Sequence, residues 1–388
     1  MTSNSEPQTT ADCRGAAGTA GLIYTSSDVP GLSRRRTGKG FAYHDPDGTH
    51  VTDPRVLRRI GALAIPPAWT SVWICPDENG HVQAVGDDER GRRQYRYHAR
   101  FREVRDSVKF EHMMAFAEVL PRLRRQVAID MAGAGLGQRK VLATVVNLLE
   151  STMIRVGNAD YARENRSYGL TTLLSRHVSI DGADLRFHFK GKSGKTWRLG
   201  LHDRRIAKVV KSCQELPGQH LFQYLDDDGQ RQTVTSSDVN AYLREVSGAD
   251  ITAKDFRTWI GTVLAANALA EFEAPESDAQ VKKNVTLAIE RVSARLGNTP
   301  TICRKCYVHP EIVGAYLEGA LLLKAQRPIK GQRCDHLENL HSNEAAVLSF
   351  LHARTGRDNA ATQHSTRAAR PRRRAPIPSP APGPPPCR

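Results

Sequence analysis

The 388-residue sequence lacks the marks of several common classes of protein. It has no apolar run long enough to cross a membrane as a helix. Its first twenty residues lack the charged-then-apolar pattern of a secretory signal. Seven cysteines, an odd number in a chain of this length, do not form a disulfide framework. We therefore expect a cytoplasmic protein without a membrane partner.

The chain also has fewer acidic than basic residues. The chain has 56 Lys and Arg against 41 Asp and Glu, which gives a net charge of +15 and a pI near 9.7. The segment 361–388 holds six of the arginines, eight prolines and no acid, and the rest of the chain still keeps about +9. Such a balance favours nucleic acid as a partner. The tail either adds nonspecific attraction to DNA or is a solvated linker.

Two short motifs suggest sites that the rest of the sequence does not complete. Gly194-Lys195-Thr196 resembles the end of a phosphate-binding loop, but position 189, where the loop needs glycine, is Phe. A nucleotide cradle is therefore not expected. Cys303 and Cys306 have the spacing of half a zinc site, yet no second Cys-x-x-Cys pair follows. We expect buried thiols here and no metal. A Gly-x-Ser-x-Gly nucleophile elbow is absent too.

Turn signals and hydrophobic periodicity divide the chain into four parts. Residues 1–20 are rich in Ser, Thr, Gly and Ala and are expected to be disordered. Residues 21–105 alternate short β-prone runs with turns and predict a small antiparallel sheet. Residues 106–356 have mainly helical periodicity, interrupted by a three-stranded β meander over 177–201. Residues 357–388 are expected to form a disordered basic tail. The predicted fold class is α+β.

Five short segments stand out, although each taken alone reads as a charged surface, a turn or a strand face. In chain order they cover 91–98, 154–173, 187–192, 251–259 and 296–310. The last four resemble, in the same order, the first arginine box, lysine hairpin, second arginine box and tyrosine box of the type IB DNA topoisomerases. The first resembles the strand that this family lays in the major groove. The similarity is to the compact poxvirus-type branch, which is also common in bacteria, and runs from about 22 to 325.

The resemblance implies a set of catalytic residues whose chemistry suits the reaction. Tyr307 would attack a DNA phosphate, and a cationic pocket would help to activate its hydroxyl, whose free pKa is about 10. Arg155 and Arg257 would donate paired hydrogen bonds to the nonbridging oxygens as charge concentrates there. Lys192 would protonate the departing 5′-oxygen. Asn298 stands where viral and eukaryotic relatives usually have histidine, and its amide donates without carrying charge.

The same resemblance implies contacts to DNA and an activity. The expected DNA-binding residues are Gln94, Tyr95, Tyr97, Asn158, Tyr161 and Lys254. The implied enzyme relaxes supercoiled DNA through a 3′-phosphotyrosyl intermediate, strand swivelling and religation, without ATP, metal or other cofactor. It would act as a monomer that clamps the duplex in a bacterial nucleoid, with no obligatory protein partner.

Three alternatives remain at this point. A tyrosine recombinase shares the Arg, Lys and Tyr chemistry, but usually has a His-x-x-Arg second box where this chain has Lys254 and Arg257. A noncatalytic DNA-compacting protein would use the basic charge alone and leaves the ordered segments unexplained. A zinc-dependent module built on Cys303 and Cys306 would require bound metal.

Overall fold

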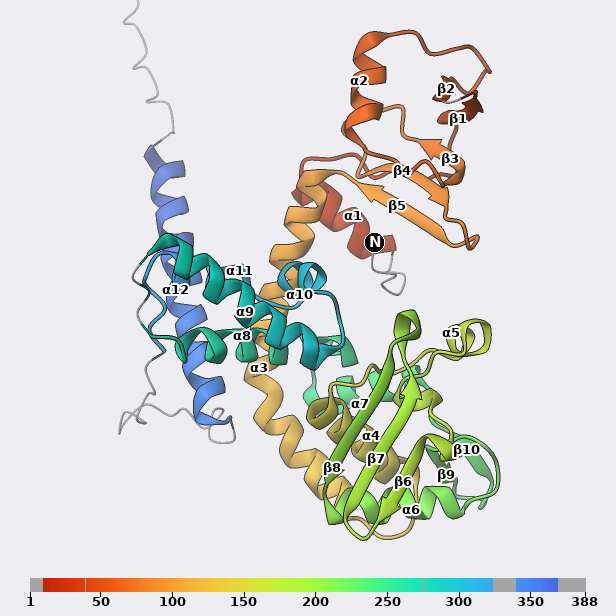
Figure 1. Cartoon of the computed structure of the whole chain (residues 1–388), viewed down its shortest axis with the longest axis vertical. Coiled ribbons are helices and arrows are strands. Elements are labelled where there is room, and N and C mark those ends of the chain that lie inside the picture. Colours follow the sequence, from red (N-terminus) through yellow and green to blue (C-terminus); the bar gives the residue numbers. More distant parts are fainter. Residues whose placement is uncertain (1–9, 39, 274, 276, 324–339, 369–388) are drawn as a thin grey trace, which may run out of the picture. The chain divides into compact units, whose positions relative to one another are not determined.

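The chain forms two compact units, which are described separately. The computed structural model describes residues 10–38, 40–273, 275, 277–323 and 340–368 (Figure 1). One unit comprises Met1–His112 and the other Met113–Arg388. The predicted domain boundary after residue 105 falls inside the long helix α3 (Ala99–Ala132), which contributes its beginning to one unit and the rest to the other. None of the helices in these described ranges is long and apolar enough to span a membrane.

The first unit is built on a five-stranded antiparallel sheet, as predicted. Its elements are α1 (Thr10–Thr19), β1 (Leu32–Thr37), β2 (Gly40–His44), α2 (Pro54–Ala62), β3 (Thr70–Ile74), β4 (Val82–Asp87) and β5 (Arg93–Tyr97). The strand order is β2-β1-β3-β4-β5. Chain neighbours β1–β2, β3–β4 and β4–β5 form antiparallel pairs joined by short turns, the arrangement that the Gly-rich turn sequences favour.

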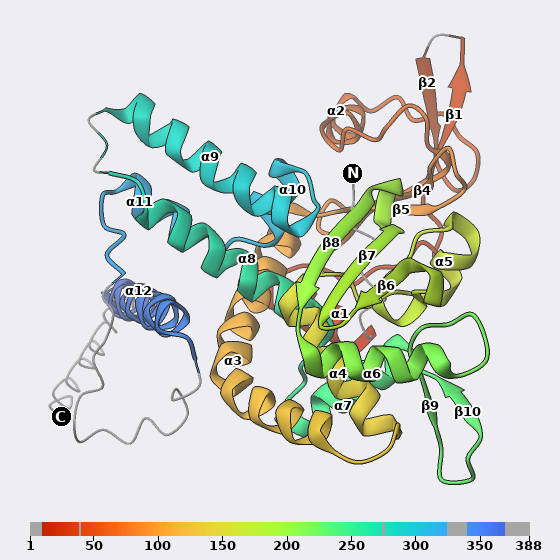
Figure 2. The same ribbon diagram turned by 60° about the horizontal axis from the view of Figure 1, so that its bottom comes forward.

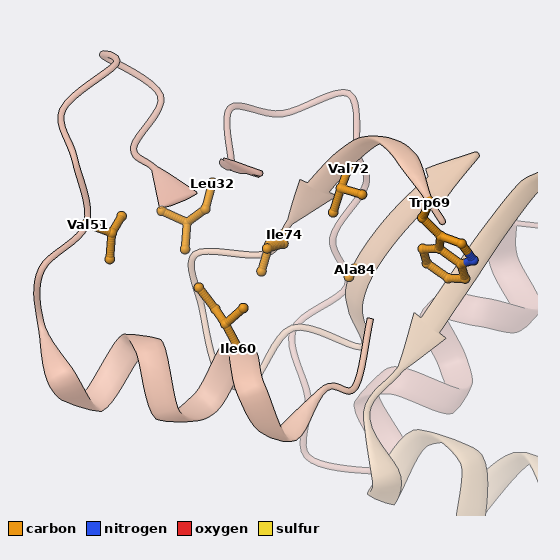
Figure 3. Packing of buried hydrophobic residues seen from close by; sticks show 7 residues of the cluster. All are labelled: Leu32, Val51, Ile60, Trp69, Val72, Ile74 and Ala84. Atoms are coloured by element: carbon orange, nitrogen blue, oxygen red, sulfur yellow. The ribbon is translucent and has the colours of Figure 1, made fainter. Parts of the chain in front are cut away.

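Helix α2 packs against this sheet through an apolar cluster (Figure 3). Ile60 from the helix meets Leu32, Ile74 and Ala84 from the strands, and each is at most 5% exposed. Asp53 caps the helix by accepting a hydrogen bond from the Arg55 amide. The cap satisfies a backbone donor that the first turn leaves unpaired, while burial of apolar side chains holds the helix to the sheet.

The prediction of a disordered segment over 1–20 is wrong for its described part. Residues Thr10–Thr19 form α1, and Ala17 and Ala20 are buried in a cluster with Leu22 and Phe101. Alanine-rich sequences are weakly apolar, so composition alone cannot separate disorder from a small packed helix. Here the packing of α1 against Phe101, far along the chain, favours the ordered helix.

The second unit is mainly helical and carries the expected meander. Its helices are α4 (Gln138–Thr152), α5 (Ala159–Asn165), α6 (Arg204–Glu215), α7 (Ser236–Ser247), α8 (Ala253–Ala270), α9 (Asp278–Leu296), α10 (Pro300–Cys306), α11 (Pro310–Leu317) and α12 (Ser342–Ala368), with short 3-10 turns η1 (Leu170–Thr172), η2 (Ser175–His177) and η3 (Lys192–Gly194). Its strands are β6 (Val178–Asp181), β7 (Asp184–Lys190), β8 (Thr196–His202), β9 (Gln223–Leu225) and β10 (Arg231–Thr233). Figure 2 shows β6, β7 and β8 side by side, with β7 in the middle.

Two terminal features of this unit compare directly with the sequence predictions. The sequence Thr252-Ala-Lys-Asp255, which favours a capping box, forms one at the start of α8, because Asp255 accepts hydrogen bonds from the backbone and hydroxyl of Thr252. The predicted disordered tail began at residue 357, whereas α12 continues to Ala368, so that boundary is wrong. The rest of the tail, 369–388, lies outside the described residues.

A largely buried ionic cluster fastens α12 to the helical core. Arg124 on α3 donates to Glu344 on α12 at 2.8 and 2.9 Å and to Glu150 on α4. The indole of Trp259 on α8 donates to the Glu344 carboxylate at 3.2 Å. Burial raises the pKa of Glu344, but hydrogen bonds and charge from Arg124 lower it by more, so its pKa lies below the ordinary value.

We predict that Glu344→Ala lowers the free energy of unfolding by about 2–3 kcal/mol, because it removes an acceptor from a buried cation. Because the folded-state pKa is depressed, this stabilisation is present above the unfolded pKa of about 4.3 and is lost as pH falls through the folded value. Urea titration followed by tryptophan fluorescence, repeated at several pH values, measures the free energy of unfolding and its dependence on pH. Glu318→Ala, which breaks an exposed pair with Arg354, should cost less than about 1 kcal/mol. Equal costs for the two variants would contradict the prediction.

Candidate active site

The backbone of Tyr307 is held against helix α8. Tyr307 ends α10, whose start is capped by Thr299. The hydroxyl of Thr262 donates to the Tyr307 carbonyl at 3.2 Å and accepts from the His309 amide at 3.1 Å. A Cβ on Gly261 would lie 2.6 Å from the same carbonyl oxygen, so only glycine allows this approach. Helix α8 therefore fixes the backbone of the tyrosine and of the residue two positions after it.

Arg257, one turn earlier on α8, joins three segments of the unit. Its guanidinium donates to the carbonyl oxygens of Met153 and Leu296, the latter at 2.7 Å, and lies over the Tyr307 ring with its central carbon 5.2 Å from the centroid. The residue is only 4% exposed. Each carbonyl belongs to a residue two positions before another predicted site residue. The guanidinium thus ties the Arg155 and Asn298 segments to the tyrosine.

Arg155 lies in a short extended segment after α4 that is bound along the turn η1. The Leu170 amide donates to the Arg155 carbonyl at 2.9 Å, and the Thr171 amide donates to the Val156 carbonyl at 2.7 Å. A Cβ on Gly169 would stand 2.5 Å from the Arg155 oxygen, and Gly157 has φ +107. Gly157 and Gly169 permit the Arg155 segment and the turn η1 to pair closely, and this pairing directs Arg155.

Asn298 completes the group from the other side. It follows Gly297, the left-handed C-cap of α9, with φ +66. Its side-chain oxygen accepts a hydrogen bond from Arg155. Its amide nitrogen is buried without a hydrogen-bond partner among the described residues, as is Nε of Arg257. Two unused buried donors beside two cationic groups form a site suited to an anion with several oxygen acceptors.

The charges of this pocket act on the tyrosine. Burial raises the pKa of Tyr307, but the positive charges of Arg257 and Arg155, together with side-chain hydrogen bonds to the phenol, lower it by more, so its pKa lies below the ordinary value. Burial, assisted by the charge of Arg155, lowers the pKa of Arg257 to about 10, which leaves it protonated at neutral pH. The pocket therefore holds a cation over the ring of a phenol that ionises more easily than usual.

The structure places Lys192 beside this group rather than inside it. Lys192 begins the turn between β7 and β8 and is half-buried. The preceding Gly191 packs on Trp197 of β8, whose ring also lies against Gly297, directly before Asn298. The predicted catalytic residues thus come from one unit. Arg257 contacts Tyr307, Arg155 contacts Asn298, and Lys192 lies on the adjoining hairpin.

The predicted DNA-binding residues fall into two groups. In the first unit, Gln94, Tyr95 and Tyr97 lie on β5; Tyr95 is exposed, while Tyr97 stacks on both Tyr95 and Phe101 and is half-buried.

In the second unit, Asn158 caps α5 by accepting from the Tyr161 amide at 2.8 Å, and Lys254 is exposed in the first turn of α8. Asn158 and Tyr97 therefore have structural tasks beside any contact with DNA.

The two cysteines of the tyrosine segment are thiols in the structure. Cys303 is buried and Cys306 is half-buried on α10. Desolvation raises the pKa of Cys303 to about 11. The described residues contain no group of three side chains arranged to hold a metal ion. Cys334 and His336, two candidates for completing a zinc site, lie outside the described residues.

Comparison with known proteins identifies the family. The model of the eukaryotic DNA topoisomerase I catalytic core matches residues 98–329, and that of the bacterial DNA topoisomerase IB N-terminal domain matches residues 40–88. DNA topoisomerase 1B of Acanthamoeba polyphaga mimivirus is 32% identical over 287 residues, which cover 72% of this chain and 85% of the relative. The chain belongs to the type IB DNA topoisomerases.

More distant topoisomerases also align with this chain. DNA topoisomerase 1B of Vaccinia virus (strain Copenhagen) is 22% identical over 59% of this chain and 70% of its own length. DNA topoisomerase 1 of Mycosarcoma maydis is 25% identical over 58% of this chain and 26% of its own length. The family expected from the five segments is confirmed.

The sequence analysis missed the residues that support this topoisomerase site. Thr262 and Gly261 were not recognised, although Gly261 lies four residues after Arg257 and therefore on the same side of the helix, with Thr262 next to it in the chain. Trp197 was counted only as part of a strand. None of these residues has reactive chemistry of its own, so a search for catalytic residue types passes over them.

We predict that Thr262→Val, which keeps the shape and removes the hydroxyl, slows DNA cleavage by about 10²-fold, since it frees the backbone around Tyr307. Thr262→Ser should restore most of the rate. Thr258→Val is the matched control, because that hydroxyl bonds only within its own helix, to the Lys254 carbonyl. Single-turnover cleavage rates provide the measurement. Equal losses in the Thr262→Val and Thr258→Val variants would show that Thr262 contributes only to helix stability.

Proposed function

We propose that this chain relaxes supercoiled DNA by transient cleavage of one strand, with Tyr307 as the nucleophile. The observation that carries the proposal is the phenol of Tyr307 beneath the Arg257 guanidinium, with Arg155 and the unpaired Asn298 amide alongside. A phosphodiester placed there would meet positive charge and free donors, and its phosphorus would lie within reach of an activated hydroxyl.

In the proposed reaction, the Tyr307 oxygen bonds to phosphorus as the bond from phosphorus to the 5′-oxygen breaks. The phenol proton is lost, and Lys192 gives a proton to the departing 5′-oxygen. Arg155, Arg257 and Asn298 donate hydrogen bonds to the nonbridging oxygens, where negative charge grows; a single such donor is typically worth about 10²–10³ in rate. The 5′-hydroxyl then attacks the phosphotyrosine and restores the strand.

The energetics explain why this proposal includes no ATP. The phosphotyrosyl bond retains the energy of the phosphodiester, and torsional strain in the DNA drives the swivelling between cleavage and religation. The cationic side chains occupy the role that a metal ion has in other phosphoryl-transfer enzymes. All five proposed catalytic residues come from one unit of one chain, so we propose that it acts as a monomer, clamping the duplex, on bacterial chromosomal DNA.

Six further residues are proposed to contact the duplex. They are Gln94, Tyr95, Tyr97, Asn158, Tyr161 and Lys254. On β5, the amide and phenol groups suit base edges, while the interleaved arginines suit phosphates. The exposed Lys254, three residues before Arg257, would add a phosphate contact close to the site of cleavage.

The test is relaxation of a negatively supercoiled plasmid in EDTA without ATP. The wild type should relax the plasmid, and Tyr307→Phe should be slower by more than about 10³-fold, because it lacks the attacking oxygen. Denaturing the wild-type reaction midway should trap a covalent adduct at the 3′ end of the broken strand. Binding of the variant to DNA is the control. Relaxation by Tyr307→Phe, or none by a wild type that binds DNA, would overturn the proposal.

A further inference from the structure

Trp197 occupies a position that neither the reaction chemistry nor the family resemblance accounts for. A Cβ on Gly191 would lie 2.6 Å from its indole nitrogen, and a Cβ on Gly297 would lie 2.6 Å from Cζ2, farther along the same ring system. One indole therefore contacts both glycines. Each glycine stands directly before a proposed catalytic residue, Lys192 in one case and Asn298 in the other.

The two sides of this contact are not equally well fixed. Arg257 donates to the Leu296 carbonyl and Arg155 donates to the Asn298 side chain, so the turn at 297–298 is anchored without the tryptophan. In the hairpin turn, the Gly191 amide donates to the Lys195 carbonyl at 2.8 Å and the Gly194 amide donates to the Gly191 carbonyl at 3.0 Å, and the Tyr168 amide donates to the Lys190 carbonyl at 2.7 Å just before the turn. None of these bonds reaches the 297–298 turn, so loss of the indole would remove a contact that joins the two turns.

Aromatic packing holds the indole itself in place. Trp197 pairs across the strands with Phe189, the two rings being nearly parallel at 3° with centroids 6.2 Å apart. Phe189 is 4% exposed and packs in turn on His177, which meets Tyr168 edge to face at 4.5 Å. The aromatic residues of the meander thus pack against the Trp197 ring and hold it in a fixed position.

We propose that Trp197 is a positioning residue that holds the Lys192 turn against the Asn298 turn and so sets the distance from the general acid to the scissile phosphate. This inference rests on the proposed function, because it assigns Lys192 the delivery of a proton. It adds a residue without reactive chemistry to the determinants of the cleavage rate. It also explains Gly191, whose φ of −97° would suit any residue, by the lack of space for a side chain beside the indole.

The first test measures single-turnover cleavage of a DNA duplex at a phosphate mapped by adduct trapping. Trp197→Ala should slow cleavage by about 10²-fold through displacement of Lys192, and Trp197→Phe should fall between it and the wild type. Gly191→Ala should also slow cleavage, but should add nothing in the Trp197→Ala background. Gly200→Ala on the same strand, with no atom within 4 Å of its added Cβ, is the matched control and should keep the wild-type rate.

A substrate with sulfur in place of the bridging 5′-oxygen separates proton delivery from damage to the fold. A thiolate leaves without a proton, so it does not need the general acid. Trp197→Ala should recover most of its lost rate on this duplex, as should Lys192→Ala. A thermal melt and DNA binding confirm that each variant is folded.

Two results would overturn the proposal in different ways. If Trp197→Ala is equally slow on the oxygen and sulfur substrates while Lys192→Ala is rescued by sulfur, Lys192 is the acid and Trp197 does not position it. If Lys192→Ala is not rescued either, the proposed role of Lys192 is wrong and the inference fails with it.

Discussion

The site depends on one buried cation. The Arg257 guanidinium is almost wholly withdrawn from water, which is costly unless its donors find partners. Two backbone carbonyls, those of Met153 and Leu296, satisfy part of this need, and the ring of Tyr307 covers one face. Both carbonyl partners are neutral, so the positive charge remains available to the tyrosine and to an incoming phosphate. A salt bridge here would hold the arginine equally well but cancel that charge.

The surrounding backbone is shaped to bring the two carbonyls to the arginine. Met153 ends α4 in the left-handed region with φ +58, and Gly297 ends α9 in the same region with φ +66. Each helix therefore stops abruptly, and the residues that follow, Arg155 and Asn298, turn toward the pocket. Close approach at Gly261 lets α8 support the tyrosine from behind. These two helix ends are far apart in the sequence, and the hydrogen bonds of Arg257 to the Met153 and Leu296 carbonyls connect them.

The sequence predicted those parts of the molecule that follow from local pattern. Alternation and turn signals indicated the first sheet and the meander, and the capping box at Thr252 marked the start of α8. The proposed catalytic residues were identified by the resemblance of four segments, in a fixed order, to those of a family. What escaped prediction depends on contacts between distant segments: α1 packs on Phe101, and Trp197 contacts two glycines about a hundred residues apart. No periodicity within a segment reports such contacts.

We expect Arg257 to lower the pKa of Tyr307 before DNA binds. This pKa can be measured in the DNA-free protein by NMR with carbon-13 at the tyrosine Cζ, with the signal assigned by Tyr307→Phe. It should lie below the usual value of about 10 in the wild type and rise clearly in Arg257→Gln. Arg304→Gln, which removes an exposed charge from α10, should leave it nearly unchanged. An ordinary pKa in the wild type, or the same pKa after loss of Arg257, would contradict the claim.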